Sequence, residues 1–111
     1  MKKLYKGNGM KKLLAALFFV SSSAHAITGN ELLASLENKE PGVRMYGLGY
    51  ISAVADMTRG TIQCPNPNVT YGQAQDVVIK FVKENPEIRH FPASQIVTFI
   101  LNQTWPCKGE I

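Results

Sequence analysis

Apolar residues recur at three- and four-residue steps along four stretches of the chain, which is the spacing of one face of an α-helix. The first stretch begins with Thr28 and Glu31, whose three-residue separation is that of a capping box. Its apolar residues are Leu32, Leu33 and Leu36. The polar segment 37–42 ends in Pro-Gly, which predicts a loop before the second helix.

The second predicted helix covers residues 43–59, and its apolar positions define one face. That face carries Val43, Tyr46, Tyr50, Val54 and Met57. An exposed glycine lowers helix stability by roughly 1 kcal/mol relative to alanine, so we expect Gly47 and Gly49 to permit close approach of another helix backbone. Gly60 suits the C-terminal cap, and two prolines in the segment 61–69 predict a loop.

A second capping box, formed by Thr70 and Gln73, opens the third helix, and Asn85-Pro86 ends it. The expected buried face carries Ala74, Val77, Val78, Phe81 and Val82. Residues 86–92 then form a connector, in which Pro92 suits the first position of a fourth helix. The residues that this helix directs inward are Ala93, Ile96, Val97, Ile100 and Leu101. The pattern therefore predicts an all-α fold, a small bundle of four helices.

Residues 1–26 have the pattern of a secretory signal peptide. A pair of lysines precedes the apolar run 13–20, and the small-residue motif Ala24-His25-Ala26 follows it. This run is much shorter than the ~20 residues that cross a bilayer, so we expect cleavage after Ala26 rather than a membrane anchor. Met10, directly before the lysines, is an alternative start to Met1.

Cleavage changes the charge of the protein. The full sequence has 12 basic and 8 acidic residues, a formal net charge of +4. Five of the basic residues lie before residue 27 and no acidic residue does, so seven basic residues face eight acidic ones in the domain 27–111, a net charge of −1. We therefore expect no binding of nucleic acid and no attachment to a membrane after cleavage.

The chain has two cysteines, Cys64 after the second helix and Cys107 near the C-terminus. Export to an oxidising compartment favours a disulfide, and two cysteines allow one intramolecular pairing. The bond would close a loop of about 43 residues and contribute roughly 4 kcal/mol on the loop-entropy model. A metal site is disfavoured, because His90 is the one histidine after residue 26.

The sequence offers little support for catalysis. With both cysteines oxidised and no Gly-x-Ser-x-Gly motif present, a nucleophile beside a base is missing. Asp56 and Asp76 fall on separate helices, so they do not form an acid–base pair. Metal-ligand spacing and a phosphate-binding glycine loop are also absent. We therefore expect no catalytic residue, no metal and no cofactor, which leaves binding as the broad class of function.

A series of short motifs indicates which kind of binding protein this is. In chain order they are Gly29-Asn30-Glu31-Leu32-Leu33, Gly49-Tyr50-Ile51-Ser52-Ala53-Val54-Ala55-Asp56, Cys64-Pro65, Val69-Thr70-Tyr71-Gly72-Gln73, residues 85–93 and Trp105-Pro106-Cys107. Together they cover nearly the whole mature chain, which resembles the Rap/Tai immunity proteins. The resemblance implies a small all-helical periplasmic protein, often a homodimer. Such a protein binds and blocks a peptidoglycan amidase effector of a type VI secretion system.

The resemblance also implies roles for residues. Cys64 and Cys107 match the family's cysteines, which supports their pairing. The second-helix motif matches at Gly49, Tyr50 and Asp56, where the tyrosine and small residues look like packing elements. Positions that commonly carry a second cysteine pair are Ser35 or Leu36 and Gly47 in this chain.

The connector 86–92 matches the family loop that can enter an effector's active-site cleft. The candidate partner-binding residues are Glu87, Ile88, Arg89, His90 and Phe91. The expected disulfide would fix the last two helices and present this connector between them. A plain helix connector with a solvated charge cluster is the alternative interpretation of the same residues.

Two other functions fit an exported helical domain without catalytic groups. A periplasmic acid-stress chaperone would expose apolar helix faces at low pH, although His90 alone titrates near neutrality. An envelope accessory protein without an effector is the other alternative. An amidase gene beside this one would favour immunity, since immunity genes usually lie beside their toxin.

Overall fold

The computed structural model describes residues 26–108, which form four α-helices and one short 3-10 helix. The elements are α2 (Gly29–Leu36), α3 (Pro41–Thr58), α4 (Tyr71–Glu84), η1 (Pro86–Ile88) and α5 (Ala93–Thr104). Within this part of the chain, β-structure is limited to isolated bridges. The predicted all-α fold of four helices is therefore confirmed, while the predicted signal peptide lies outside the described residues except for Ala26.

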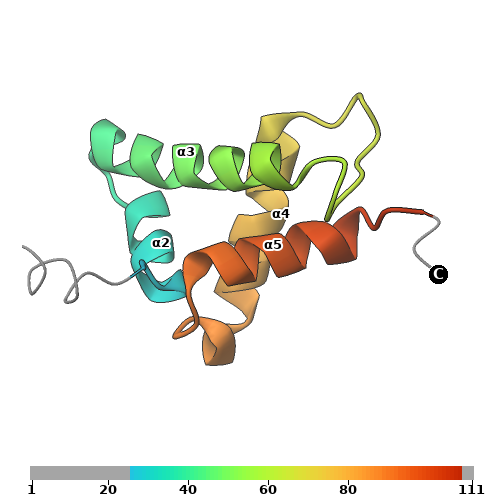
Figure 1. Ribbon diagram of the computed structural model, residues 1–111. Helices are drawn as coiled ribbons and strands as arrows, with labels where there is room; N and C mark the ends of the chain where they lie inside the picture. Colours follow the sequence, from blue (N-terminus) through green and yellow to red (C-terminus); the bar gives the residue numbers. More distant parts are fainter. Residues whose placement is uncertain (1–25, 109–111) are drawn as a thin grey trace, which may run out of the picture.

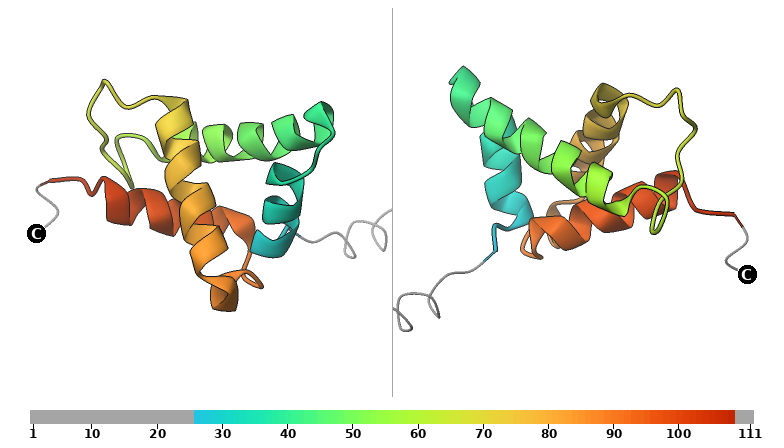
Figure 2. Two further views of the ribbon diagram at one scale, coloured as in Figure 1. Left: turned by 180° about the vertical axis from the view of Figure 1, so that it is seen from behind. Right: turned by 45° about the horizontal axis from the view of Figure 1, so that its top comes forward.

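The helices enclose one core. In Figure 1, α3 and α5 run across the molecule one above the other, and α4 crosses behind both. The view from behind shows α4 passing over the two, with the short α2 beside one end of α3 (Figure 2). All four helices contribute to the core, whose fully buried side chains include Leu32, Ile51, Val78, Val82, Val97 and Leu101.

Both predicted capping boxes are confirmed. The backbone N–H of Glu31 donates to Thr28 Oγ1 at 3.3 Å, and the N–H of Thr28 donates to Glu31 Oε1 at 3.2 Å. Thr70 and Gln73 exchange the same two bonds at 3.1 and 2.8 Å. Because each pair satisfies N–H groups that the first helical turn leaves free, the starts of α2 and α4 are set by local sequence.

Two proline boundaries differ from prediction. Pro41, expected to end a loop, is the first residue of α3, where its missing N–H costs nothing and its fixed φ suits the helix. Pro92, expected at the first helical position, is instead the N-cap residue, with φ −56° and ψ 134°, and α5 begins at Ala93.

The apolar face predicted for the second helix is not the buried face of α3. The structure buries Gly47, Ile51, Ala55 and Thr58, one of them a glycine and one a threonine. From the predicted face, Tyr46 is 59% exposed and Met57 82% exposed, whereas Tyr50 and Val54 pack against the core at its edge. α3 therefore has apolar residues on two faces, and the face with the smaller side chains is the one that packs against the core.

The two glycines of α3 behave differently. A Cβ on Gly47 would lie 3.0 Å from Ser35 Oγ and 3.0 Å from Leu36 Cδ2, so this glycine does permit close approach of α2. The contact also brings together Ser35, Leu36 and Gly47, the positions at which the resemblance implies a second cysteine pair in related proteins. A Cβ on Gly49 would meet nothing within 4 Å, so Gly49 makes no close contact within the described part of the chain.

The disulfide joins the α3–α4 loop to the segment after α5. Cys64 and Cys107 are bonded, with a Cα–Cα distance of 4.7 Å and a sequence separation of 43 residues. The N–H of Cys64 also donates to the carbonyl of Trp105 at 2.8 Å. The predicted pairing is confirmed, and it anchors the C-terminal end of α5 to the loop that precedes α4.

Candidate functional site

The connector between α4 and α5 is held by the start of α2. The N–H of Gly29 donates to the carbonyl of Phe91 at 3.0 Å, and the N–H of Asn30 donates to the carbonyl of Arg89 at 2.9 Å. On the other side, the N–H of Ala93 donates to the carbonyl of Ile27 at 2.8 Å. The first two bonds use free N–H groups of the first turn of α2, and the third uses that of the first residue of α5. The connector backbone is therefore fixed by a segment 59 to 66 residues earlier in the chain.

Gly29 makes this contact possible. A Cβ at this position would lie 3.0 Å from both the Cα and the carbonyl oxygen of Arg89, and 2.6 Å from Ile96 Cδ1. The first two are backbone atoms that a side-chain rotation cannot move away. Any larger residue would therefore push the connector away from α2.

The five candidate partner-binding residues fall into two groups. Ile88 and Arg89 are half-buried, and Ile88 packs against the core. The guanidinium of Arg89 donates from Nε to the carbonyl of Val82 at 2.7 Å and from Nη2 to that of Lys83 at 2.8 Å. Arg89 thus binds carbonyls at the C-terminal end of α4, where a cation is also favoured by the helix dipole. The Arg89 side chain therefore holds the connector against the end of α4.

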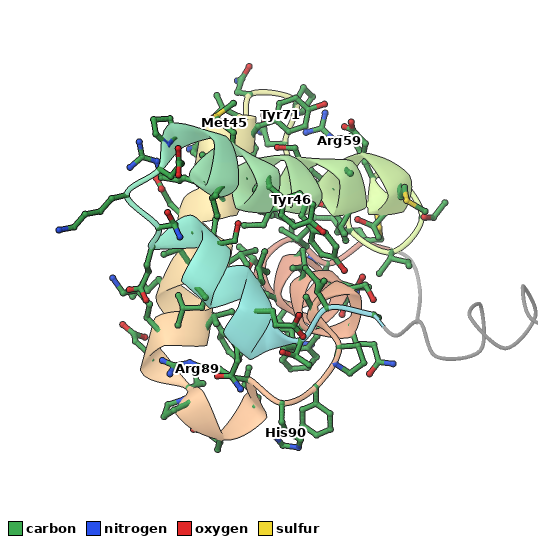
Figure 3. All side chains as sticks on the ribbon, turned by 90° about the vertical axis from the view of Figure 1, so that its left-hand side faces the viewer. Met45, Tyr46, Arg59, Tyr71, Arg89 and His90 are labelled. Atoms are coloured by element: carbon green, nitrogen blue, oxygen red, sulfur yellow. A yellow bond between two sulfur atoms is a disulfide. The ribbon has the colours of Figure 1, made fainter. Side chains whose placement is uncertain are left out.

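The other three residues, Glu87, His90 and Phe91, are exposed. The ring of His90 lies over that of Phe91, with centroids 4.2 Å apart and planes inclined by 33°, and Phe91 is 46% exposed. In Figure 3, His90 and Arg89 lie at the end of the molecule opposite Met45 and Tyr71. Besides Pro86, the exposed part of the connector is therefore an aromatic pair and one carboxylate on a fixed backbone.

An apolar cleft lies directly beside this aromatic pair. It has a volume of about 250 Å³ and is lined by Phe81, Ile88, Phe91, Gln95, Ile96 and Phe99. Phe99 is 54% exposed, and its ring centroid is 6.2 Å from that of Phe81. Sequence reasoning missed Phe99; the available signal was an aromatic residue of the fourth helix outside its predicted inward face.

The second-helix motif lies at a different place. Tyr50 is half-buried against the core, Gly49 is exposed, and Asp56 accepts a hydrogen bond from the hydroxyl of Tyr71 on α4. This hydrogen bond, and the negative charge of Asp56, raise the pKa of Tyr71 above its usual value, so the hydroxyl stays protonated and keeps donating. Asp56 thus links the end of α3 to the start of α4 and takes no part in the connector.

The disulfide is also separate from the connector. Cys107 follows the C-terminal end of α5, whereas the connector precedes its N-terminal end, and a helix of 12 residues is roughly 18 Å long. The bond therefore fixes the far end of α5, and α2 and Arg89 hold the connector itself.

No group of three or more His, Cys, Asp or Glu side chains in residues 26–108 is placed to hold a metal ion. None of the described helices is long and apolar enough to span a membrane.

Comparison with known proteins gives the family. The family model of the Rap1a immunity proteins matches residues 28–107, from the N-cap of α2 to the second cysteine of the disulfide. No curated protein matches this chain. Immunity proteins of this family are inhibitors that bind a toxin and are not enzymes, which agrees with the lack of catalytic motifs in the sequence. Because the match covers the α2 start, the connector and the disulfide together, the chain belongs to the Rap1a immunity protein family.

Proposed function

We propose that this chain is a periplasmic immunity protein that binds and inhibits a peptidoglycan amidase effector of a type VI secretion system. Two features support the proposal: the family membership, and an N-terminal segment with the pattern of a signal peptide cleaved after Ala26. The disulfide agrees with an oxidising compartment such as the periplasm.

The observation that carries the proposed binding site is the fixed backbone of the exposed connector. Three backbone hydrogen bonds hold the segment 89–93 against residues 27–30, while His90 and Phe91 remain exposed. A segment that is already ordered loses little conformational entropy on binding, which favours affinity. Aromatic side chains next to an apolar cleft are the usual anchors of a protein interface. We assign partner contact to Glu87, His90, Phe91 and the cleft, and a positioning role to Ile88 and Arg89.

The test is binding of a candidate amidase, encoded beside this gene, to the oxidised domain 27–111. Removing both exposed rings with His90→Ala and Phe91→Ala is expected to weaken binding by at least about thirtyfold, the loss of roughly 2 kcal/mol typical of an interface hot spot. Tyr46→Ala is the matched control, since Tyr46 is an exposed aromatic on α3 and its loss should leave amidase affinity unchanged. Calorimetric titration gives the affinities.

Arg89→Ala separates positioning from contact. It removes two hydrogen bonds from a charged donor, so it should lower the melting temperature as well as amidase affinity, whereas the His90 and Phe91 variants should melt like the parent protein. In cells, the parent protein should prevent lysis by the amidase in the periplasm. Continued lysis together with no measurable complex would refute immunity toward that amidase, and equal affinity of the double variant would refute the connector as its site.

We further propose that the exposed face of α3 pairs with a second copy of this chain. One stripe of this face contains no charged residue, and its members are Gly42, Tyr46, Gly49, Ala53 and Met57. In an antiparallel pairing about a two-fold axis near Ile51, Gly49 faces Ala53 of the second copy, and Tyr46 lies near its Met57. The small residues allow close approach of the two helices, while the large ones cover each other. The second copy would then fill the open space beside Gly49.

Ala53→Glu tests this pairing. The substitution places a carboxylate near the centre of the proposed interface on both copies, so sedimentation should change from dimer to monomer. Lys80→Glu, on an exposed position of α4, is the control and should leave the dimer intact. A monomeric parent protein at high micromolar concentration would contradict the dimer. Since α3 and the connector lie at opposite ends of the molecule, amidase binding should survive the loss of the dimer (Figure 3).

A further inference from the structure

A second cavity lies at the other end of the molecule from the connector. It has a volume of about 310 Å³ and is enclosed by the C-terminal end of α3, the loop that carries Cys64, the start of α4 and Trp105. This is the lower end of the range of about 300–1,000 Å³ typical of small-molecule sites. Neither the connector nor the exposed face of α3 accounts for it.

The wall of this cavity holds hydrogen-bonding groups that the chain leaves free. Arg59 is exposed and forms no ion pair, since Lys83–Glu37 is the one ion pair within residues 26–108. The N–H of Tyr71, a lining residue at the positive end of the α4 dipole, donates no hydrogen bond inside the same range, and neither does the N–H of Gly72, the next residue along the helix. These donors suit an anionic oxygen.

Acceptors occupy the same wall. Asp56 is held by the hydroxyl of Tyr71, whose raised pKa keeps the proton on the phenol, and its second carboxylate oxygen is free. Gln63 is 2% exposed; its Nε2 donates to the carbonyl of Ala55 at 3.0 Å, but its Oε1 has no partner. An unsatisfied buried acceptor is unusual in a folded protein, and Gln63 is one of the residues that line the cavity.

The two kinds of group together define the ligand. A simple anion would be repelled by Asp56 and a simple cation by Arg59, whereas a molecule with a carboxylate and an ammonium group satisfies both. The apolar part of the wall, which includes Ala74 and Trp105, suits an aliphatic side chain. We propose that this cavity binds a small zwitterion, a free α-amino acid or a dipeptide with an apolar side chain. Its carboxylate lies toward Arg59 and the start of α4, and its ammonium group toward Asp56 and Gln63.

The test is a nuclear magnetic resonance titration of the oxidised domain 27–111 with leucine and with alanyl-leucine. Saturable shifts of the Trp105 indole and of the Tyr71 and Gly72 amides are expected. The same dipeptide with an acetylated N-terminus and an amidated C-terminus lacks both charges and should bind at least about tenfold more weakly, because each lost charge contact is worth roughly 1.4 kcal/mol or more. Comparing leucine with the dipeptide shows which ligand length fits.

Asp56→Asn and Arg59→Gln should each weaken binding about tenfold. Both positions are exposed, and asparagine still accepts from Tyr71, so the fold is retained. Lys80→Gln, away from the cavity wall, is the matched control and should bind like the parent protein. Shifts that never saturate, or equal affinity for the capped dipeptide, would overturn the proposal. Amidase binding is not needed for any of these measurements, so the outcome is independent of the immunity function.

Discussion

Replacing both cysteines, in the variant Cys64→Ser with Cys107→Ser, is expected to lower the free energy of unfolding by about 4 kcal/mol. The bond closes a loop of 43 residues that contains all of α4 and α5, so its removal mainly increases the freedom of the unfolded chain. A domain of this size has a total stability of roughly 5–15 kcal/mol, so the loss is a large part of it. Urea unfolding of the two proteins measures the difference.

The native structure of the serine variant should change little, because other bonds hold the same segments. The hydrogen bond from Cys64 N–H to the Trp105 carbonyl and that from Asn102 Nδ2 to the Ile62 carbonyl at 2.7 Å do not depend on sulfur. The parent protein in excess reductant is the control and should match the variant. A loss below about 1 kcal/mol would show that these hydrogen bonds, rather than loop closure, hold the end of α5.

Ile51→Ala is expected to destabilise the protein by about 2–5 kcal/mol, and Met57→Ala by less than about 0.5 kcal/mol. Ile51 is 0% exposed on the inner face of α3, whereas Met57 is 82% exposed. The apolar pattern of the sequence predicts the opposite order, since Met57 belongs to the predicted face and Ile51 does not. Denaturant unfolding of both variants at low concentration, where association through α3 does not contribute, measures the two losses.

This pair of variants distinguishes two packings of the same helix. If Met57→Ala proved the more destabilising at low concentration, α3 would be rotated relative to the structure, and the stripe assigned to a second copy would belong to the core. Comparable losses at high concentration alone would instead place Met57 in an interface between copies.

Local sequence explains where two of the four helices, α2 and α4, begin, and which face α2, α4 and α5 bury. Thr28 and Thr70 each find a partner three residues later, and the aliphatic positions of α4 and α5 form a single stripe, so propensity, capping and burial agree. α3 is the exception because it has apolar residues around much of its circumference. Which face it buries depends on the space left by α2, and Gly47 fits against Ser35 and Leu36 where a tyrosine would not.

The sequence indicated which segment carries the candidate site, but not which of its side chains are exposed. The sequence pointed to residues 87–91 through the family resemblance, yet it could not separate Arg89, which binds carbonyls of α4, from His90 and Phe91, which face outward. That separation depends on where the connector lies relative to α2 and α4. Phe99 and Gln63 were missed for the same reason, since their roles come from neighbours distant in the chain.

By itself, the sequence determined that this protein is an all-α domain with one disulfide and the motifs of an immunity family. The fold class and the disulfide follow from short-range chemistry: hydrogen bonds across three residues, a helical period of apolar side chains, and two cysteines with one possible pairing. The family follows from the resemblance of its motifs. The tertiary structure alone decided the buried face of α3, the fixed position of the connector against α2 and the polar cavity beside Asp56 and Gln63. Each of these depends on the distance between segments far apart in the chain, which packing sets and local pattern does not contain.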